Sequence, residues 1–168
     1  MKPLHNEWIE FAKRDYYTLK KLDGDEYLTN IVLFHSQQCI EKLFKGIMEA
    51  SGADVPRIHN TKKLYELIAD VIDQPMDVDD LLYIDSVYIE SRYPASFGLL
   101  PGGQPTLKES QKAIEIVKKI LSLLDLDFES RGGSDENIDI KNRRFSSRKS
   151  DVVFGTTQRC CHDRAIEK

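Results

Sequence analysis

Arginine, histidine and carboxylate side chains are the groups in this sequence best suited to chemistry on a phosphate ester. Arg92 closes an apolar helical pattern and precedes a glycine-rich stretch, residues 95–104. A guanidinium grips phosphate through two N–H groups, whereas an imidazole titrates near neutrality and can accept a hydroxyl proton. The chain has no histidine between His59 and His162. Arg92 is therefore suited to contact a phosphate or a carboxylate rather than to transfer a proton.

A second polar group lies in the segment that follows the first glycine. Gln38, Glu41 and Lys45 are spaced i, i+3 and i+7, which places them on one face of a helix. Glu41 and Lys45 form a favourable i, i+4 pair, worth about 0.3–0.5 kcal/mol when exposed. Two interpretations stay open: a solvated helix face, or a polar patch that faces Arg92 across the bundle or across a dimer.

Other residues near Arg92 are candidates with structural alternatives. Asp85 is on the same expected helix, and Arg92 could simply favour the helix dipole there and pair with Asp85 or Glu90. Tyr93 is a candidate ligand contact, although a packing role is expected more often. Asp15 interrupts an apolar stripe, and a buried carboxylate needs a partner such as Arg92 or a lysine.

The remaining histidines and cysteines predict no metal site. His59 is interpreted as a residue at a helix entry, and His35 as a hydrogen-bonded histidine within a helix. Cys160, Cys161 and His162 are adjacent, and three consecutive residues cannot surround a tetrahedral ion. We therefore expect neither a metal nor a cofactor.

Apolar residues at helical spacing place these groups on about five helices. No strand-like alternation longer than a few residues occurs before position 128. The second expected helix has a core-directed face of five residues and a second stripe that begins apolar and turns polar, so it is central in the bundle or contacts a second subunit. The third is expected to bury Leu64, Leu67, Ile68, Val71 and Ile72. The expected helices are about 5–22, 25–50, 60–74, 77–93 and 106 onward, the last opened by a capping box of Thr106 and Glu109.

Composition divides the chain into a helical bundle, residues 1–126, and a flexible tail, residues 127–168, expected to be disordered. Residues 1–128 hold 15 Lys and Arg against 21 Asp and Glu, a net charge of −6, which gives no general attraction for nucleic acid. DNA is not a predicted partner, and an RNA contact would need a local basic site. The N-terminus lacks the apolar stretch of a signal peptide, and no run approaches a membrane span, so the cytoplasm is predicted.

The segment Phe34-His35-Ser36-Gln37-Gln38-Cys39-Ile40-Glu41-Lys42-Leu43-Phe44-Lys45 resembles the second helix of HEPN-domain proteins. In that family an aromatic residue, a Gln-Gln pair and a Glu-Lys pair precede a further lysine. His59 before the third helix, and Tyr88 through Arg92-Tyr93-Pro94 at the end of the fourth, agree with the same family over about residues 5–125.

The resemblance implies an antiparallel, up-and-down bundle of four to five helices that forms a homodimer. It also implies pairing with a minimal nucleotidyltransferase in a toxin–antitoxin-like system. Many members are metal-independent ribonucleases with an arginine followed four to six residues later by a histidine. Arg92 matches the arginine, but Phe97, Gly98 and their neighbours stand where the histidine belongs.

The sequence thus predicts a nucleotide-, RNA- or partner-binding module that lacks the standard nuclease histidine, which favours a non-catalytic protein and leaves enzymatic activity open. Its expected ligand contacts are Arg92, Tyr93, Gln38, Glu41, Lys45 and Asp85. One alternative is a divergent ribonuclease toxin that uses Tyr93 or His59 beside Arg92. Another is a dimerisation scaffold without a ligand.

Overall fold

Five α-helices and one short 3-10 helix make up the computed structural model, which describes residues 4–91 and 104–129. The elements are α1 (Leu4–Leu22), α2 (Thr29–Ser51), α3 (Thr61–Ile68), η1 (Ala69–Val71), α4 (Val78–Ser91) and α5 (Leu107–Leu123). No strand occurs in these two stretches, which confirms the predicted all-α fold class.

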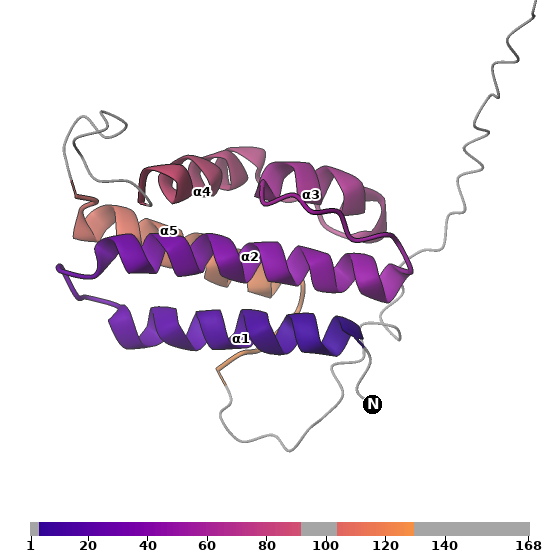
Figure 1. Cartoon of the computed structure of the whole chain (residues 1–168), viewed down its shortest axis with the longest axis horizontal. Coiled ribbons are helices and arrows are strands. Elements are labelled where there is room, and N and C mark those ends of the chain that lie inside the picture. The colour runs from indigo at the N-terminus through magenta and orange to yellow at the C-terminus, as the bar shows by residue number, and fades with distance from the viewer. Residues whose placement is uncertain (1–3, 92–103, 130–168) are drawn as a thin grey trace, which may run out of the picture.

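Helix α2 is the central element of the bundle. It packs against α1, α3, α4 and α5. Figure 1 shows α2 between α1 on one side and the α3–α4 pair on the other, with α5 crossing behind it. This position confirms the first of the two roles predicted for the second helix.

Three local differences from the sequence prediction have physical causes. Helix α2 begins at Thr29 rather than near residue 25 because the Asp25 carboxylate accepts the backbone N–H groups of Tyr27 and Leu28, at 2.9 and 3.2 Å. This local turn competes with the helix. The predicted burial of Leu67 is wrong, since its side chain is 57% exposed. The face of α3 that meets the core is formed by Leu64 and Ile68, spaced i, i+4, and Leu67 points away from it. The third difference is the end of this helix, which stops at Ile68 and continues as the 3-10 helix η1, so that Val71 and Ile72 are only partly buried.

The predicted helix starts at residues 60 and 106 are confirmed. The Asn60 side chain accepts the backbone N–H of Lys63 at 2.8 Å, which caps α3. Thr106 and Glu109 form the expected capping box of α5. Each cap satisfies N–H groups that the first helical turn leaves without partners.

Packing continues beyond the end of α5. Phe128 is 2% exposed, and its ring lies edge-on to that of Tyr16, with the centroids 5.9 Å apart. Glu129 accepts hydrogen bonds from the Tyr16 hydroxyl and the Lys20 ammonium. Residues past the expected bundle limit at 126 therefore still pack against α1.

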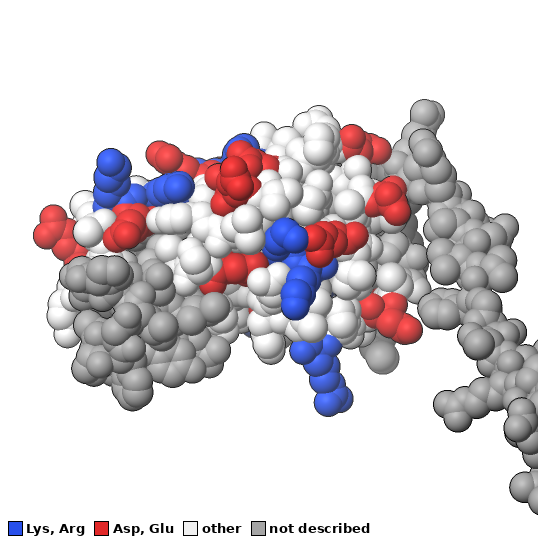
Figure 2. Space-filling model, turned by 90° about the horizontal axis from the view of Figure 1, so that it is seen from above, with Lys and Arg blue, Asp and Glu red and all other residues white. Residues whose placement is uncertain are grey.

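The charged surface is mixed. Figure 2, which views the molecule from the side of α3 and α4, shows basic and acidic side chains interspersed rather than gathered into one field. In the part of the chain described, no helix combines the length and the apolar character that crossing a bilayer requires.

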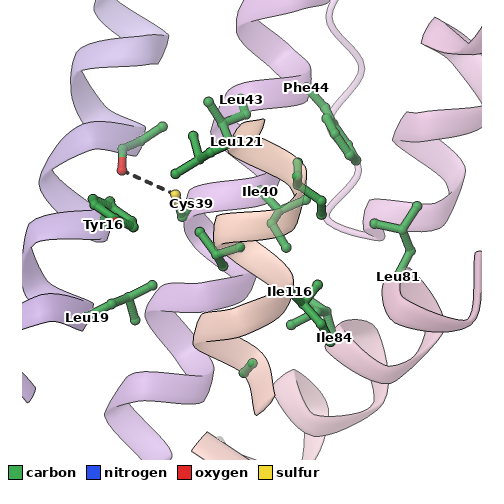
Figure 3. Packing of buried hydrophobic residues seen from close by; sticks show 14 of the residues in the cluster. Tyr16, Leu19, Cys39, Ile40, Leu43, Phe44, Leu81, Ile84, Ile116 and Leu121 are labelled. Atoms are coloured by element: carbon green, nitrogen blue, oxygen red, sulfur yellow. Dashed lines mark hydrogen bonds between the residues drawn. The ribbon is translucent and has the colours of Figure 1, made fainter. Parts of the chain in front are cut away.

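The hydrophobic core is built around α2. Its predicted core face is confirmed, since each of its residues is at most 2% exposed: Leu33, Ile40, Leu43, Phe44 and Ile47. Figure 3 shows Ile40, Leu43 and Phe44 among side chains from the neighbouring helices. The Cys39 thiol points toward α1 and donates a hydrogen bond to the carbonyl oxygen of Ala12 at 3.4 Å.

Candidate functional site on the central helix

A buried carboxylate, Glu41, is the centre of the main polar cluster. Glu41 is 4% exposed. Its partner Lys45, one helical turn later, is 6% exposed. The Lys45 ammonium donates to Glu41 Oε1 at 2.8 Å, and the Gln37 amide donates to Oε2 at 3.0 Å. A buried charge is tolerated only when it is paired and hydrogen-bonded, so these donors form one interdependent unit.

His59 joins this cluster from the connection between α2 and α3. Its Nδ1 lies 3.0 Å from Glu41 Oε1 and 3.2 Å from Oε2, and its side chain is 67% exposed. The Gln37 amide also donates to the His59 backbone carbonyl at 2.5 Å. A carboxylate at one ring nitrogen fixes the orientation of an imidazole and directs the other nitrogen, Nε2, to a different partner.

Gln38 borders the same cluster. Its amide donates to Gln37 Oε1 at 2.7 Å and lies 3.5 Å from Glu41 Oε2. Gln38, Glu41 and Lys45 are therefore brought together, but not as a solvated helix face, because Glu41 and Lys45 are buried. The indole of Trp8 in α1 covers the lysine, with the Lys45 ammonium 5.6 Å from the ring centroid.

A second buried carboxylate, Asp15, joins α1 to the other flank of α2. Asp15 Oδ1 lies 2.9 Å from His35 Nδ1, and Oδ2 accepts a hydrogen bond from the Lys42 ammonium at 2.5 Å. The expectations of a lysine partner for Asp15 and of a hydrogen-bonded His35 are met. Two carboxylates, Glu41 of α2 and Asp15 of α1, are therefore each bonded to one lysine and one histidine along α2.

Asp85 in α4 lies at the start of α3. Its Oδ1 accepts the backbone N–H of Thr61 at 2.8 Å, and its Oδ2 accepts that of Lys62 at 3.2 Å. A carboxylate is favourable at this positive end of a helix. In this arrangement Asp85 anchors the entry of α3, next to His59.

Arg92, Tyr93 and the positions around Phe97 and Gly98 lie outside the described residues. Their predicted roles stay predictions. In the part of the chain that the structure describes, no group of three or more His, Cys, Asp or Glu side chains could hold a metal ion.

A surface cavity of about 350 Å³ lies elsewhere, beside the end of α5. Tyr16, Lys118 and Phe128 are among its lining residues, and of the predicted ligand contacts that the structure describes, Gln38, Glu41, Lys45 and Asp85, none lines it. Burial raises the pKa of the Tyr16 phenol, and the Glu129 carboxylate raises it further. The pKa of Glu129 is lowered, chiefly by the hydrogen bond from Lys20.

Gln37 is the site residue that the sequence reasoning missed. It is fully buried and bonds both Glu41 and the His59 backbone. Its position four residues before Glu41 was a usable signal, since Gln and acidic side chains at i, i+4 interact on a helix. The sequence predicts His59 as a helix-entry residue, with a role beside Arg92 only in the ribonuclease alternative, and it gives no sign of the contact with Glu41 because the two residues are 18 positions apart.

Comparison with known proteins places this arrangement in a family. A crystal structure of TT1696 from Thermus thermophilus is similar, with a TM-score of 0.61 and 26% sequence identity, covering 73% of this chain and 97% of that one. No curated protein sequence gives a significant match. The family model for the HEPN domain matches residues 5–127, which span all five helices. The chain therefore belongs to the HEPN-domain family, whose members commonly dimerise and whose domain supports a nucleotide- or RNA-related role.

Proposed function

We propose that this protein is a binding module for a nucleotide or RNA and acts through Arg92 and the polar cluster of α2. The observation that carries the proposal is the buried Glu41–Lys45 pair, held together by Gln37 and His59. Ionic groups are costly to bury, and a buried ion pair contributes little net stability, so this cluster favours a functional role over a purely stabilising one. Family membership supplies the class of ligand.

Within the cluster, the described side chains have different roles. Gln38 is half-buried and His59 exposed, so both can reach a ligand. Glu41 and Lys45 are already paired with each other, and we assign them the task of orienting their neighbours. Asp85 contributes by holding the entry of α3 in place, while Tyr93 stays a predicted contact beside Arg92.

The proposed setting is a homodimer in the cytoplasm that engages a minimal nucleotidyltransferase, as a toxin–antitoxin-like pair. The family resemblance of α2 and of residues 88–94 supports this partnership. We expect this protein to co-purify with a nucleotidyltransferase encoded beside its gene. Absence of co-purification would reject the proposed partnership.

RNA binding tests the main proposal. Arg92→Ala should weaken binding of a fluorescent single-stranded RNA about 10- to 100-fold, because a hydrogen bond to a charged group contributes about 1.5–3 kcal/mol. Fluorescence anisotropy measures the change. Arg14→Ala, on the exposed face of α1, is the matched control and should retain affinity.

Equal affinity of wild type and Arg92→Ala would reject the role of Arg92. Metal-independent cleavage of the RNA by wild type, lost in Arg92→Ala, would reject a purely binding function. A folded protein whose melting temperature no nucleotide or RNA shifts would favour the ligand-free dimerisation scaffold.

A divergent ribonuclease is the second candidate function, and the His59–Glu41 contact favours it. An exposed imidazole held by a carboxylate at Nδ1 is suited to accept a proton through Nε2. This candidate predicts growth arrest on expression, relieved by His59→Ala. Harmless overexpression of the wild type, verified by blotting, would count against it.

A further inference from the structure

The connection between α2 and α3, with the first turn of α3, carries a local basic site in an otherwise acidic bundle. Residues 55–63 contain Arg57, His59, Lys62 and Lys63 and no acidic residue. We call Arg57, His59 and Lys63 the basic site. Arg57 and Lys63 are exposed, as is His59.

The two long cations of this site are available to a ligand. Lys62 pairs with Glu66 one turn later, and His59 contacts Glu41. Within residues 4–91 and 104–129, no ion pair engages Arg57 or Lys63. Asp54 precedes this segment and Glu66 follows it, but neither forms an ion pair with Arg57 or Lys63. Exposed cations that are not engaged in ion pairs can contact a phosphate backbone.

The segment that carries the basic site is held in place at several points. Gln37 bonds the His59 carbonyl, Glu41 bonds the imidazole, and Asn60 caps α3. Asp85 holds two backbone N–H groups of the same turn. Because the contacts of Gln37, Glu41 and Asp85 tie this segment to α2 and α4, the site is positioned before any ligand arrives, which lowers the entropic cost of binding.

The charge pattern of α3 is opposite to what its own stability favours. The first turn of a helix favours acidic side chains, and a cation there is unfavourable by about 0.3–1 kcal/mol. In α3 the first turn has no acidic residue and holds two lysines. Asp85 supplies the negative charge from α4 instead. A local rule broken with a compensating contact is typical of a functional site.

We propose that Arg57, His59 and Lys63 form a contact site for the phosphodiester backbone of single-stranded RNA, with Glu41 and Gln37 as positioning residues for His59. The inference rests on the proposed function, because the ligand class comes from it. It adds a binding surface on the α2–α3 connection that does not depend on Arg92.

Salt-dependent RNA binding tests the site. The double variant Arg57→Gln/Lys63→Gln removes two charges from exposed positions, so it should fold normally. Its affinity for a fluorescein-labelled single-stranded RNA should fall at least tenfold at low salt. Between about 50 and 200 mM salt, log K for RNA binding falls as log salt rises, and the double variant should make this slope less steep by about 1.4. Each single-strand phosphate contact contributes about 0.7 to the slope.

The matched control removes the same number of charges elsewhere. Lys108→Gln/Lys118→Gln changes two exposed lysines of α5, which lies behind α2 in Figure 1. The control should change the RNA affinity and the salt slope by only a small fraction of the changes expected for Arg57→Gln/Lys63→Gln. His59→Gln should weaken binding further in the double variant, with the melting temperature checked by circular dichroism.

Three results would overturn the inference while leaving the proposed function standing. The first is RNA binding by wild type with equal losses in both double variants, which would mean a general charge effect. The second is unchanged RNA affinity in Arg57→Gln/Lys63→Gln together with lost binding of a nucleotidyltransferase, which would make the surface a protein contact. The third is an unchanged salt slope. Absence of any RNA or nucleotide binding by wild type would instead reject the proposed function itself.

Discussion

Glu41 is the residue on which the polar cluster depends. Its two oxygens receive donors from Lys45 and Gln37 and contact the His59 ring, and its side chain is almost inaccessible to solvent. Removing one partner of such a pair leaves the other buried and uncompensated, which is costlier than removing both.

A double-mutant cycle on Glu41 and Lys45 measures this dependence. Glu41→Leu should lower the free energy of unfolding by about 3–5 kcal/mol because it strands the Lys45 ammonium. The double variant Glu41→Leu/Lys45→Met should lose clearly less free energy of unfolding than the losses of Glu41→Leu and Lys45→Met added together. Urea unfolding followed by circular dichroism gives the values. Additive losses within about 0.5 kcal/mol would show that the two side chains act independently.

The close approach of α1 and α2 is the main feature at the scale of elements, and Gly46 permits it. A Cβ atom at Gly46 would lie 2.9 Å from Ile9 Cδ1 and 3.3 Å from Trp8 Cβ. Ile9 is 1% exposed, so its side chain is closely surrounded. Glycine destabilises the interior of α2, but the absence of a side chain at this position allows α1 and α2 to pack closely.

Gly46→Ala should destabilise the protein by about 1 kcal/mol, since an overpacking cost of about 1–3 kcal/mol exceeds a helix-propensity gain of about 1 kcal/mol. In an Ile9→Val background, which removes Cδ1, the same substitution should become neutral or stabilising. Thermal and urea unfolding of the four proteins check the change of sign. A stabilising Gly46→Ala in the wild-type background would show that Ile9 moves freely.

The α1–α2 interface also makes stability depend on alkaline pH. Burial raises the pKa of the Cys39 thiol well above its ordinary value, and the nearby Asp15 carboxylate raises it further. The unfolded chain therefore releases this proton before the folded chain does. A raised folded pKa gives stability that is complete below the unfolded value, about 8.5, and declines as the pH rises above it.

Between about pH 8.5 and 10, the Cys39 contribution should decrease by up to about 2 kcal/mol, at about 1.4 kcal/mol per pH unit. The control is Cys39→Ala, whose unfolding free energy should decline less steeply over the same range. Subtracting the slope of unfolding free energy against pH for Cys39→Ala from that for wild type leaves the contribution of Cys39, because all other titrating groups are common to both proteins. Parallel curves would mean that the thiol ionises equally in both states.

At the scale of the whole molecule, α2 has an apolar end that the bundle does not cover. Tyr27, just before α2, is 79% exposed, and Ile31 in its first turns is 36% exposed. Members of the family commonly dimerise. We therefore place the proposed homodimer contact at this end of α2, which continues into the polar cluster.

Light scattering should give twice the 19.3 kDa of one chain. Ile31→Glu should weaken dimerisation at least tenfold, because burying an isoleucine contributes about 1.5–3 kcal/mol and a charge opposes it. Leu67→Glu, at an exposed position on α3, is the control and should leave the dimer intact. A monomeric wild type, or a dimer that only Leu67→Glu disrupts, would contradict this placement.

The central position of α2 was one of two roles that the sequence left open, and the packing of the other helices around it decided between them. The all-α class, the core face of α2 and the capped starts of α3 and α5 could be predicted from the sequence alone. These features depend on apolar spacing and capping residues within a few positions of one another, which a local pattern records. Only the tertiary structure paired Glu41 with His59 and Asp15 with His35, across 18 and 20 residues. It also placed Asp85 at the start of α3 and exposed Leu67. Those outcomes depend on how the helices pack against one another, which no local spacing specifies.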